Sequence, residues 1–536
     1  MSRLTPFAAA TAAALFSVAV VAAPPSPTPG NVFRAGETAT IPLDFIHKDG
    51  KGLAITASSA AKSKWLVIDI DGVTLAEGES QGDLLSLPHA ALGGRLGAFI
   101  LSVVSGEGGS VTNETRLAFI PSGEVKPCKW VGTQFHYSRD TWGKGDERLL
   151  DLVAAAGIGI VRDEPYWSAC EKEPGKYAMH PIIGQLVDGL CARGLDFCCI
   201  LCYSNPKAYP ENPLDANAFA RWSAWCADYL KGRCDTFEIW NEPHNFHFWQ
   251  QYGPLEGCTD RRDPRWIRHF TDFSRTVDDA LAGRGLRVCV GAEDWPELLH
   301  TMLEQGIARP HNIVTIHPYD HTQPLPERAK WFRDGFADLR RRIEKSHPEA
   351  HEGKAKVAIT EVGWTTFDAT RNPTHDFVGF YPPVTYQNQA RYLVRMYLMA
   401  RQFGAEFVCQ YDFKDDGLKA NHTEHNFGLL DYWGHPKPSY AAIAAMTRLV
   451  GHAEPEGLLD GVDPAVARIY RFRREDGATV LAAWAVEGEM DVELGLRASA
   501  IKQSAAFDLY GNRIEPPVKG GKLHLTGQPV YLVVSS

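Results

Sequence analysis

The sequence predicts an α/β protein built around a (β/α)8 TIM barrel, flanked by an N-terminal β-sandwich and a small C-terminal β-domain. Three observations support this fold class. Between residues 125 and 453, short apolar runs alternate with amphipathic helical segments eight times. Residues 31–124 and 454–536 instead alternate apolar and polar positions, as half-buried strands do. The length of 536 residues also fits about three domains.

The first 23 residues have the features of an export signal. Arg3 supplies a positive charge, an Ala- and Val-rich run follows, and Val21-Ala22-Ala23 offers small residues for cleavage. Residues 24–30 form a Pro-rich linker. An uncleaved membrane anchor is the alternative, although the apolar run is short for a bilayer span. We expect a secreted or periplasmic protein with no stable membrane association after signal cleavage.

Strand-like alternation and turn residues predict the two flanking domains. In the N-terminal domain, residues 65–70 and 98–104 have the pattern of strands, and Asp-Gly or Gly-Gly pairs mark the turns. In the C-terminal domain, residues 467–472 and 529–534 have the same pattern. Both regions are therefore expected to consist mainly of β-sheet.

Eight strands and five helices can be placed in the central region. The predicted strands are 130–135, 158–162, 196–201, 235–240, 287–291, 313–316, 356–360 and 407–411. Amphipathic helices are predicted over 146–156, 215–230, 266–281, 327–345 and 386–403. A doubly wound open sheet is the alternative, but no Gly-rich phosphate-binding fingerprint follows the first strand. The barrel is therefore preferred.

Composition narrows the class of protein. The chain carries 55 Lys and Arg against 65 Asp and Glu, a formal net charge of −10, which argues against a nucleic-acid partner. Eleven cysteines lie between Cys128 and Cys409. An odd number spread through one domain is not a disulfide framework, so most are expected to be small buried hydrophobes, with one or two bridges left open. No CxxC pair recurs at the spacing of a zinc site.

Two glutamates end apolar strands of the predicted barrel. Glu242 follows the fourth strand and Glu361 follows the seventh. Because barrel enzymes place their active sites at the C-terminal ends of the strands, both carboxylates should reach one cleft from nearly opposite walls. Glycoside hydrolysis needs one carboxyl to protonate the leaving oxygen and another to attack or to activate water. A separation of roughly 5 to 5.5 Å would indicate retention of configuration, and about 9 Å inversion.

The motifs around these glutamates resemble those of glycoside hydrolase clan A, the retaining (β/α)8 glycosidases, and most of all its family 39-type members. Trp240-Asn241-Glu242-Pro243 resembles the strand-four signature, and Thr360-Glu361-Val362-Gly363-Trp364 the strand-seven nucleophile segment. Three further segments are similar to the second, sixth and eighth units of these enzymes: Ile160-Val161-Arg162, His317-Pro318-Tyr319 and Asn426-Phe427-Gly428-Leu429-Leu430.

The resemblance implies a role for each motif residue. Glu242 would be the general acid/base, Glu361 the nucleophile, and Asn241 the contact to the 2-hydroxyl of the sugar. Tyr319 would hold Glu361 by a hydrogen bond, and Arg162 would lie beneath Glu361 and keep it ionised by lowering its pKa. This chemistry needs no cofactor and no metal.

Other residues that follow the strands are candidates for contacts with a carbohydrate substrate. They are His317, His136, Tyr137, Trp167, His244, Trp249, Trp295 and Trp364. The sequence departs from many clan members after strand eight, where Cys409-Gln410-Tyr411-Asp412-Phe413 lacks the common Trp platform. No His was found after strand three, where many relatives carry one.

Alternative functions remain open at this point. A transglycosidase would use the same two glutamates, and a non-catalytic carbohydrate-binding barrel would need neither. The sequence does not indicate which sugar or linkage is recognised, or whether chains are cut internally or at their ends. Asp412, Asp415 and Asp416 could hold calcium, but their spacing lacks the pattern of a calcium loop, so a solvated acidic loop is preferred.

Overall fold

A computed structural model confirms the predicted fold class. It describes residues 30–42, 47–48, 54–55, 63–80, 84–105, 111–123, 125–139, 142, 144–245, 247–320, 322–346, 355–371, 381–493 and 504–534. The predicted signal peptide and nearly all of the linker lie outside the described residues, and the exact domain limits stay predictions. Within the described residues, no helix is long and apolar enough to cross a bilayer.

Eight parallel strands form a closed barrel. They are β10 (Cys128–Gln134), β11 (Ile158–Asp163), β14 (Asp196–Leu201), β15 (Thr236–Ile239), β16 (Arg287–Glu293), β17 (Ile313–Ile316), β18 (Lys356–Ile359) and β19 (Val408–Gln410). Each agrees with its predicted range to within two residues at either end. Pairing of Val131 with Val408 closes the barrel. Gly132 is required at this seam because a Cβ there would lie 2.4 Å from Ile160 Cγ2.

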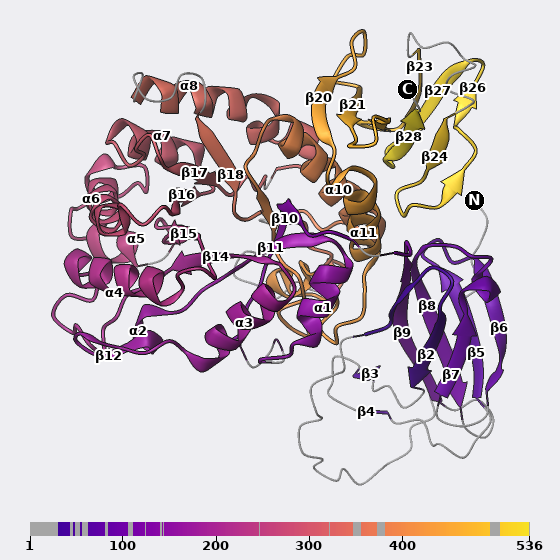
Figure 1. Cartoon of the computed structure of the whole chain (residues 1–536), viewed down its shortest axis with the longest axis horizontal. Helices are drawn as coiled ribbons and strands as arrows, with labels where there is room; N and C mark the ends of the chain where they lie inside the picture. The colour runs from indigo at the N-terminus through magenta and orange to yellow at the C-terminus, as the bar shows by residue number, and fades with distance from the viewer. Residues whose placement is uncertain are drawn as a thin grey trace.

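Helices surround the barrel (Figure 1). The main ones are α1 (Arg148–Ala155), α3 (Pro181–Ala192), α4 (Ala216–Tyr229), α6 (Pro264–Leu281), α7 (Pro296–Glu304), α8 (Phe336–Ser346), α10 (Tyr386–Gln402) and α11 (Pro438–Val450). Side-chain caps start several of them, such as Asp215, which accepts from Ala218 N at 2.7 Å. The short helices α2 (Trp167–Cys170) and α5 (Phe248–Tyr252) lie in loops after the strands.

One predicted helix differs from the structure. The range 327–345 was expected to be continuous, but a π-helical turn spans Trp331–Gly335 before α8 begins. Trp331 and Phe332 are adjacent in sequence and both buried. The wider turn lets both rings reach the core, which neighbouring positions of a regular α-helix do poorly.

The flanking domains are built from β-sheets. The N-terminal domain has a five-stranded sheet of β1 (Val32–Arg34), β9 (Val111–Ile120), β8 (Gly97–Ser105), β5 (Ser63–Asp69) and β6 (Thr74–Ser80), and a pair formed by β2 (Thr38–Pro42) and β7 (Leu84–Pro88). The C-terminal domain has a six-stranded sheet of β20 (Glu454–Leu458), β21 (Ala467–Arg473), β22 (Thr479–Ala485), β28 (Val530–Val534), β24 (Ala505–Phe507) and β25 (Arg513–Ile514). Its second sheet comprises β23 (Glu489–Val492), β27 (Lys522–Thr526) and β26 (Val518–Lys519).

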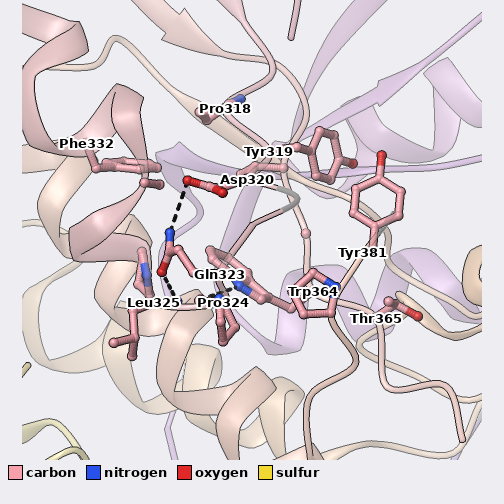
Figure 2. A pocket seen from close by; sticks show the side chains of 15 residues that line it. Pro318, Tyr319, Asp320, Gln323, Pro324, Leu325, Phe332, Trp364, Thr365 and Tyr381 are labelled. Carbon is pink, nitrogen blue, oxygen red and sulfur yellow. Dashed lines mark hydrogen bonds between the residues drawn. The ribbon is translucent and has the colours of Figure 1, made fainter. Parts of the chain in front are cut away.

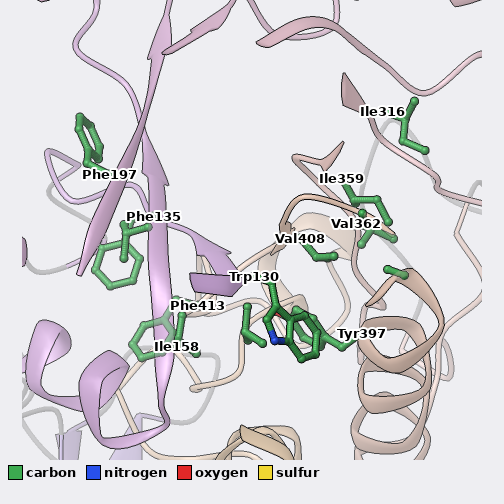
Figure 3. Packing of buried hydrophobic residues seen from close by; sticks show 14 of the residues in the cluster. Trp130, Phe135, Ile158, Phe197, Ile316, Ile359, Val362, Tyr397, Val408 and Phe413 are labelled. Atoms are coloured by element: carbon green, nitrogen blue, oxygen red, sulfur yellow. The ribbon is translucent and has the colours of Figure 1, made fainter. Parts of the chain in front are cut away.

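Both β-domains pack on the α10–α11 side of the barrel (Figure 1). They also contact each other, because Asn512 accepts from Leu96 N at 2.7 Å and donates to Leu96 O at 3.0 Å. Under α10, Trp130 and Tyr397 meet edge to face with ring centroids 6.3 Å apart (Figure 3). All eleven cysteines are free and ten are buried, as expected for small apolar side chains.

A buried arginine joins α10 to the C-terminal domain. Arg395 is 1% exposed and donates to Val486 O at 3.3 Å, to Ala485 O at 3.1 Å and to Gly527 O. Its guanidinium lies 3.5 Å from Glu327, which also accepts from Trp484 Nε1 at 2.5 Å. The interface therefore depends on one fully enclosed cation.

Replacing Arg395 should lower the stability of the whole protein. We expect Arg395→Met to lower the free energy of unfolding by about 3 to 5 kcal/mol, because Glu327 would become an unpaired buried charge. Arg341→Met on the exposed face of α8 is the control, and it should cost less than about 1 kcal/mol. Urea unfolding measures both values, and equal losses in the two variants would contradict this account.

Candidate active site

A cavity of about 510 Å³ opens at the C-terminal end of the barrel. Its size falls within the range of small-molecule sites. Every strand of the barrel contributes to its wall, either at its end or in the loop that follows. The lining residues are Gln134, His136, Arg139, Arg162, Glu164, Ile200, Tyr203, Asn241, Glu242, His244, Asn245, Arg261, Asp294, Trp295, Tyr319, Glu361, Tyr381, Tyr411, Glu424 and Phe427.

Glu242 and Glu361 face each other across this cavity. One carboxylate oxygen of each lies within 4.8 Å of the other and of a ring nitrogen of His317. The backbone that presents Glu242 is unusual, because Trp240, Glu242 and Ala292 have φ values of 71°, 44° and 45°. Such conformations cost about 1 to 3 kcal/mol each in residues with side chains and persist where the surroundings impose them.

Arg162 organises the floor beneath Glu361. Its Nη1 donates to Glu361 Oε2 at 3.0 Å and to Gln134 Oε1 at 2.7 Å. Its Nε donates to Glu238 Oε2 at 2.7 Å, and its Nη2 donates to Asn241 Oδ1 at 2.7 Å. On the other oxygen, Tyr319 Oη donates to Glu361 Oε1 at 3.1 Å. Both carboxylate oxygens of Glu361 are therefore held in place.

Glu242 is held by His317 and Asn245. Its Oε1 lies 2.8 Å from His317 Nδ1, and its Oε2 accepts from Asn245 Nδ2 at 2.9 Å. The other ring nitrogen of His317 lies 3.2 Å from Thr360 Oγ1. His317 lies behind Glu242 and outside the cavity lining, so its predicted place among the substrate contacts is corrected to a contact with Glu242.

The pKa values of the two glutamates differ from the expectation, in which Arg162 lowers the pKa of Glu361. Burial and the charge of Glu242 raise the pKa of Glu361, and together they outweigh His317, Arg162 and Tyr319, which lower it. Burial would also raise the pKa of Glu242, but the hydrogen bond and charge of His317 outweigh it and lower that pKa to about 2. The expectation counted Arg162 but overlooked burial and Glu242 at Glu361, and His317 at Glu242. Because the three groups interact closely, they titrate as one unit.

His244 is a buried cation beside Glu242. Its Nδ1 lies 2.7 Å from Glu293 Oε1, and its Nε2 lies 3.3 Å from Asp294 Oδ1. Burial lowers the pKa of His244, but these carboxylates outweigh it and raise the pKa to about 9. The imidazolium also packs against Trp295, with ring centroids 5.3 Å apart.

Four of the predicted substrate contacts lie elsewhere. Tyr137 and Trp167 are 1% and 0% exposed, and Trp167 donates to Glu171 at 2.5 Å within an aromatic cluster, so neither faces the cavity. Trp249 packs on Trp266 outside the cavity. Trp364 lines a separate hollow of about 20 Å³ and donates to Pro324 O at 2.7 Å (Figure 2). These four predictions are corrected, because a large ring after a strand packs on its own loop as readily as on a ligand.

Several lining residues were missed. Glu424, in the short turn Thr423–Asn426, faces the cavity, and burial raises its pKa to about 8. Arg261 and Tyr381 come from long loops that carry no periodic signal. Tyr411 takes a place in the wall after strand eight, where the sequence lacks the common Trp.

Side chains near the cavity include combinations that metal ions use. Four groups bring ligand atoms within 4.8 Å of one another: His136, Asp163 and Glu164; His136, Asp412 and Asp416; Glu242, His317 and Glu361; and His244, Glu293 and Asp294.

Two of the three residues considered for calcium binding, Asp415 and Asp416, contact other side chains. Asp415 pairs with Lys437 at 2.6 Å, and Asp416 accepts from Trp142 Nε1 at 2.7 Å. Within the described chain, Asp412, Asp415 and Asp416 do not converge on one point.

Known proteins resemble this chain in sequence and in fold. No family model matches it. A β-xylosidase of Geobacillus stearothermophilus is 24% identical over 313 residues, which are 52% of this chain and 54% of that protein. The chain thus spans about half the length of this relative. A family 39 glycoside hydrolase from the gut symbiont Bacteroides cellulosilyticus WH2 superposes with a TM-score of 0.70 at 21% identity, covering 95% of this chain and 99% of that one.

These likenesses confirm the predicted resemblance to the family 39-type members of clan A. Nearly the whole chain, including both flanking β-domains, shares the fold of a family 39 glycoside hydrolase. The sequence likeness to a β-xylosidase points in the same direction.

The charge of His244 should be measurable as a pH-dependent stability. Its pKa rises from 6.5 to about 9 on folding, which corresponds to about 3 kcal/mol. Because a raised pKa stabilises only the protonated form, this contribution is fully present below about pH 6.5 and is lost as the pH rises through about 9. Between about pH 6 and pH 10 the wild type should therefore lose about 3 kcal/mol more than His244→Gln. Urea unfolding at both pH values checks this, and parallel losses would contradict it.

Proposed function

We propose that the protein is a retaining glycoside hydrolase that cleaves O-glycosidic bonds of an oligo- or polysaccharide by double displacement. The observation that carries the proposal is the approach of Glu242 and Glu361, whose nearest oxygens lie within 4.8 Å. Retaining enzymes place their carboxyl groups about 5 to 5.5 Å apart, whereas inverting enzymes need roughly 6.5 to 9.5 Å to admit a water. The names of the similar proteins, a β-xylosidase and a family 39 glycoside hydrolase, support the same class.

In this mechanism Glu361 attacks the anomeric carbon and forms a covalent glycosyl ester. Arg162 and Tyr319 hold its two oxygens, so the attacking atom is fixed before the sugar arrives. Arg162 also binds Asn241 Oδ1, which leaves the amide N–H groups of Asn241 to donate to the 2-hydroxyl of the sugar. That contact strengthens in the transition state.

Glu242 protonates the leaving oxygen and then activates the water that hydrolyses the ester. In the free protein His317, 2.8 Å away, depresses the pKa of Glu242, so the proposed acid step requires the bound substrate to raise that pKa. A bound sugar excludes water and places its leaving oxygen beside Glu242, where the proton is needed. Once Glu361 is esterified its charge is gone, and Glu242 can act as the base.

We also propose that the protein is exported. The charged start, apolar run and small residues of positions 1–23 support removal of a signal peptide. A secreted or periplasmic location would give the enzyme access to polysaccharides outside the cytoplasm.

The nucleophile role is tested by Glu361→Ala. We expect a loss of at least about a thousand-fold in kcat, because no covalent ester can form. Added azide should restore turnover of an activated aryl glycoside and yield a glycosyl azide of the opposite anomeric configuration. The exposed Glu304→Ala is the control and should keep full activity. Undiminished activity of Glu361→Ala would sink the nucleophile assignment, whereas a wild type that cleaves no glycoside would favour a binding function.

The acid role is tested by Glu242→Ala with two leaving groups. A glycoside whose leaving group needs protonation should lose about 10² to 10⁴-fold in the glycosylation step. An activated aryl glycoside should be nearly unaffected in that step, because its phenolate leaves without a proton. Pre-steady-state release of the phenol measures the step directly, and equal losses for both substrates would rule out the acid role.

A further inference from the structure

The cavity wall beyond Glu242 contains an arginine from the segment between α5 and α6. Arg261 Nη1 donates to Asn245 Oδ1 at 3.1 Å, and its guanidinium carbon lies 5.8 Å from the centre of the Trp249 ring. Its own carbonyl accepts from Trp266 Nε1 at 2.7 Å, which anchors the segment on α6. The guanidinium is therefore held in position at the cavity edge, and most of its N–H groups donate to no described residue.

Each carboxylate that lines the cavity, apart from Glu424, lies beside a cation, although Arg162 and His244 each also contact a second buried carboxylate, Glu238 and Glu293. The pairs are Glu361 with Arg162 at 3.0 Å, Glu242 with His317 at 2.8 Å, Glu164 with Arg139 at 3.5 Å and Asp294 with His244 at 3.3 Å. The remaining acid, Glu424, has a pKa raised by burial to about 8, so it is largely neutral near pH 7.

Arg261 differs from these cations because it has no such carboxylate partner in the described chain. Among the described residues, no carboxylate lies within the 4.0 Å of an ion pair from its guanidinium. A guanidinium inside a partly enclosed site attracts anions more strongly than one in open solvent, because the local dielectric is lower. The cavity thus carries one cation whose partner is not part of the described protein.

The position of Arg261 identifies the part of the substrate that it meets. Asn245 lies between Arg261 and Glu242 and donates to the Glu242 carboxylate at 2.9 Å. Because Glu242 protonates the leaving oxygen, the wall behind it receives the unit that departs. Trp295 lines the same cavity, and its ring packs against His244 and lies 5.6 Å from the guanidinium carbon of Arg262.

We propose that this wall is a leaving-group subsite for an acidic glycan unit, in which Arg261 binds a carboxylate or sulfate of the departing sugar. The inference rests on the proposed function for the direction of cleavage. Guanidinium groups bind both anions through paired N–H donors. The subsite would direct the enzyme toward uronic-acid-containing or sulfated polysaccharides.

A positioning role for Arg261 is the competing explanation. Arg261 could act only by orienting Asn245, which in turn holds Glu242. That role would affect every substrate equally, because Glu242 serves every leaving group. A dependence on the charge of the leaving group separates the two explanations.

The test uses aryl glycosides of one sugar with three leaving groups: 3-carboxyphenyl, 3-sulfooxyphenyl and the neutral 3-carbamoylphenyl. On going from wild type to Arg261→Gln, we expect kcat/KM for a recognised anionic glycoside to fall about ten-fold more than for the neutral one. Comparing variants on the same substrate cancels differences in leaving-group reactivity. A selective loss for the carboxylate or for the sulfate identifies which anion is bound. Arg261→Lys should recover part of the selectivity.

Arg268→Gln is the matched control. It removes the same charge from the exposed face of α6 and should leave all three substrates unchanged. Equal losses for charged and neutral glycosides in Arg261→Gln would overturn the proposal and establish the positioning role. Thermal melts confirm that the variants are folded.

If the proposed function is wrong, anion binding at the Arg261 subsite can still be tested separately. If the wild type cleaves no glycoside, titration calorimetry on Glu361→Ala still decides the subsite. An oligogalacturonide or a sulfated galactan oligosaccharide should bind more tightly than its neutral counterpart, and Arg261→Gln should abolish the difference. Binding that is independent of ligand charge would overturn the proposal.

Discussion

The active end of the barrel depends on the buried guanidinium of Arg162. A cation that is 1% exposed must be neutralised and hydrogen-bonded on every side, and Glu238 and Glu361 supply the two charges. Four strands meet at this one group, because its partners also include Gln134 and Asn241. The nucleophile is thus placed by the requirement to satisfy a charge, and any shift of the surrounding strands would leave that charge unpaired.

Hydrogen bonds also explain how the strained backbone around Glu242 is tolerated. Glu242 and its neighbour Trp240 adopt positive φ values that residues with side chains avoid. The strain is tolerated because Glu242 is held from three directions, by His317, by Asn245 and by its own amide, which donates to Ala292 O at 3.0 Å. The closed barrel supplies the rigidity for this, since none of its eight strands is an edge.

Sequence reasoning located the strands and the two glutamates because both leave local signals. Apolar runs of four to seven residues mark buried parallel strands, and a carboxylate directly after one is easy to see. The proton order was not predictable in this way, since it depends on His317 lying 2.8 Å from Glu242, 75 residues away in sequence. Trp167 was misplaced for a similar reason, because its ring turned toward Phe219 and the helix below instead of the cavity. Arg261 gave no signal at all, since long loops lack periodicity.

The pKa order of the free protein is best understood as a consequence of charge crowding. Two carboxylates that approach within 4.8 Å cannot both ionise without a nearby cation. Arg162 is shared between Glu238 and Glu361, so His317 supplies the further cation, and its Nδ1 lies 2.8 Å from Glu242 Oε1. A sugar that enters between the glutamates screens their repulsion and removes water from both. In the free protein Glu242 therefore has the lower pKa of the two glutamates, and the proposed catalytic order requires the bound substrate to reverse this.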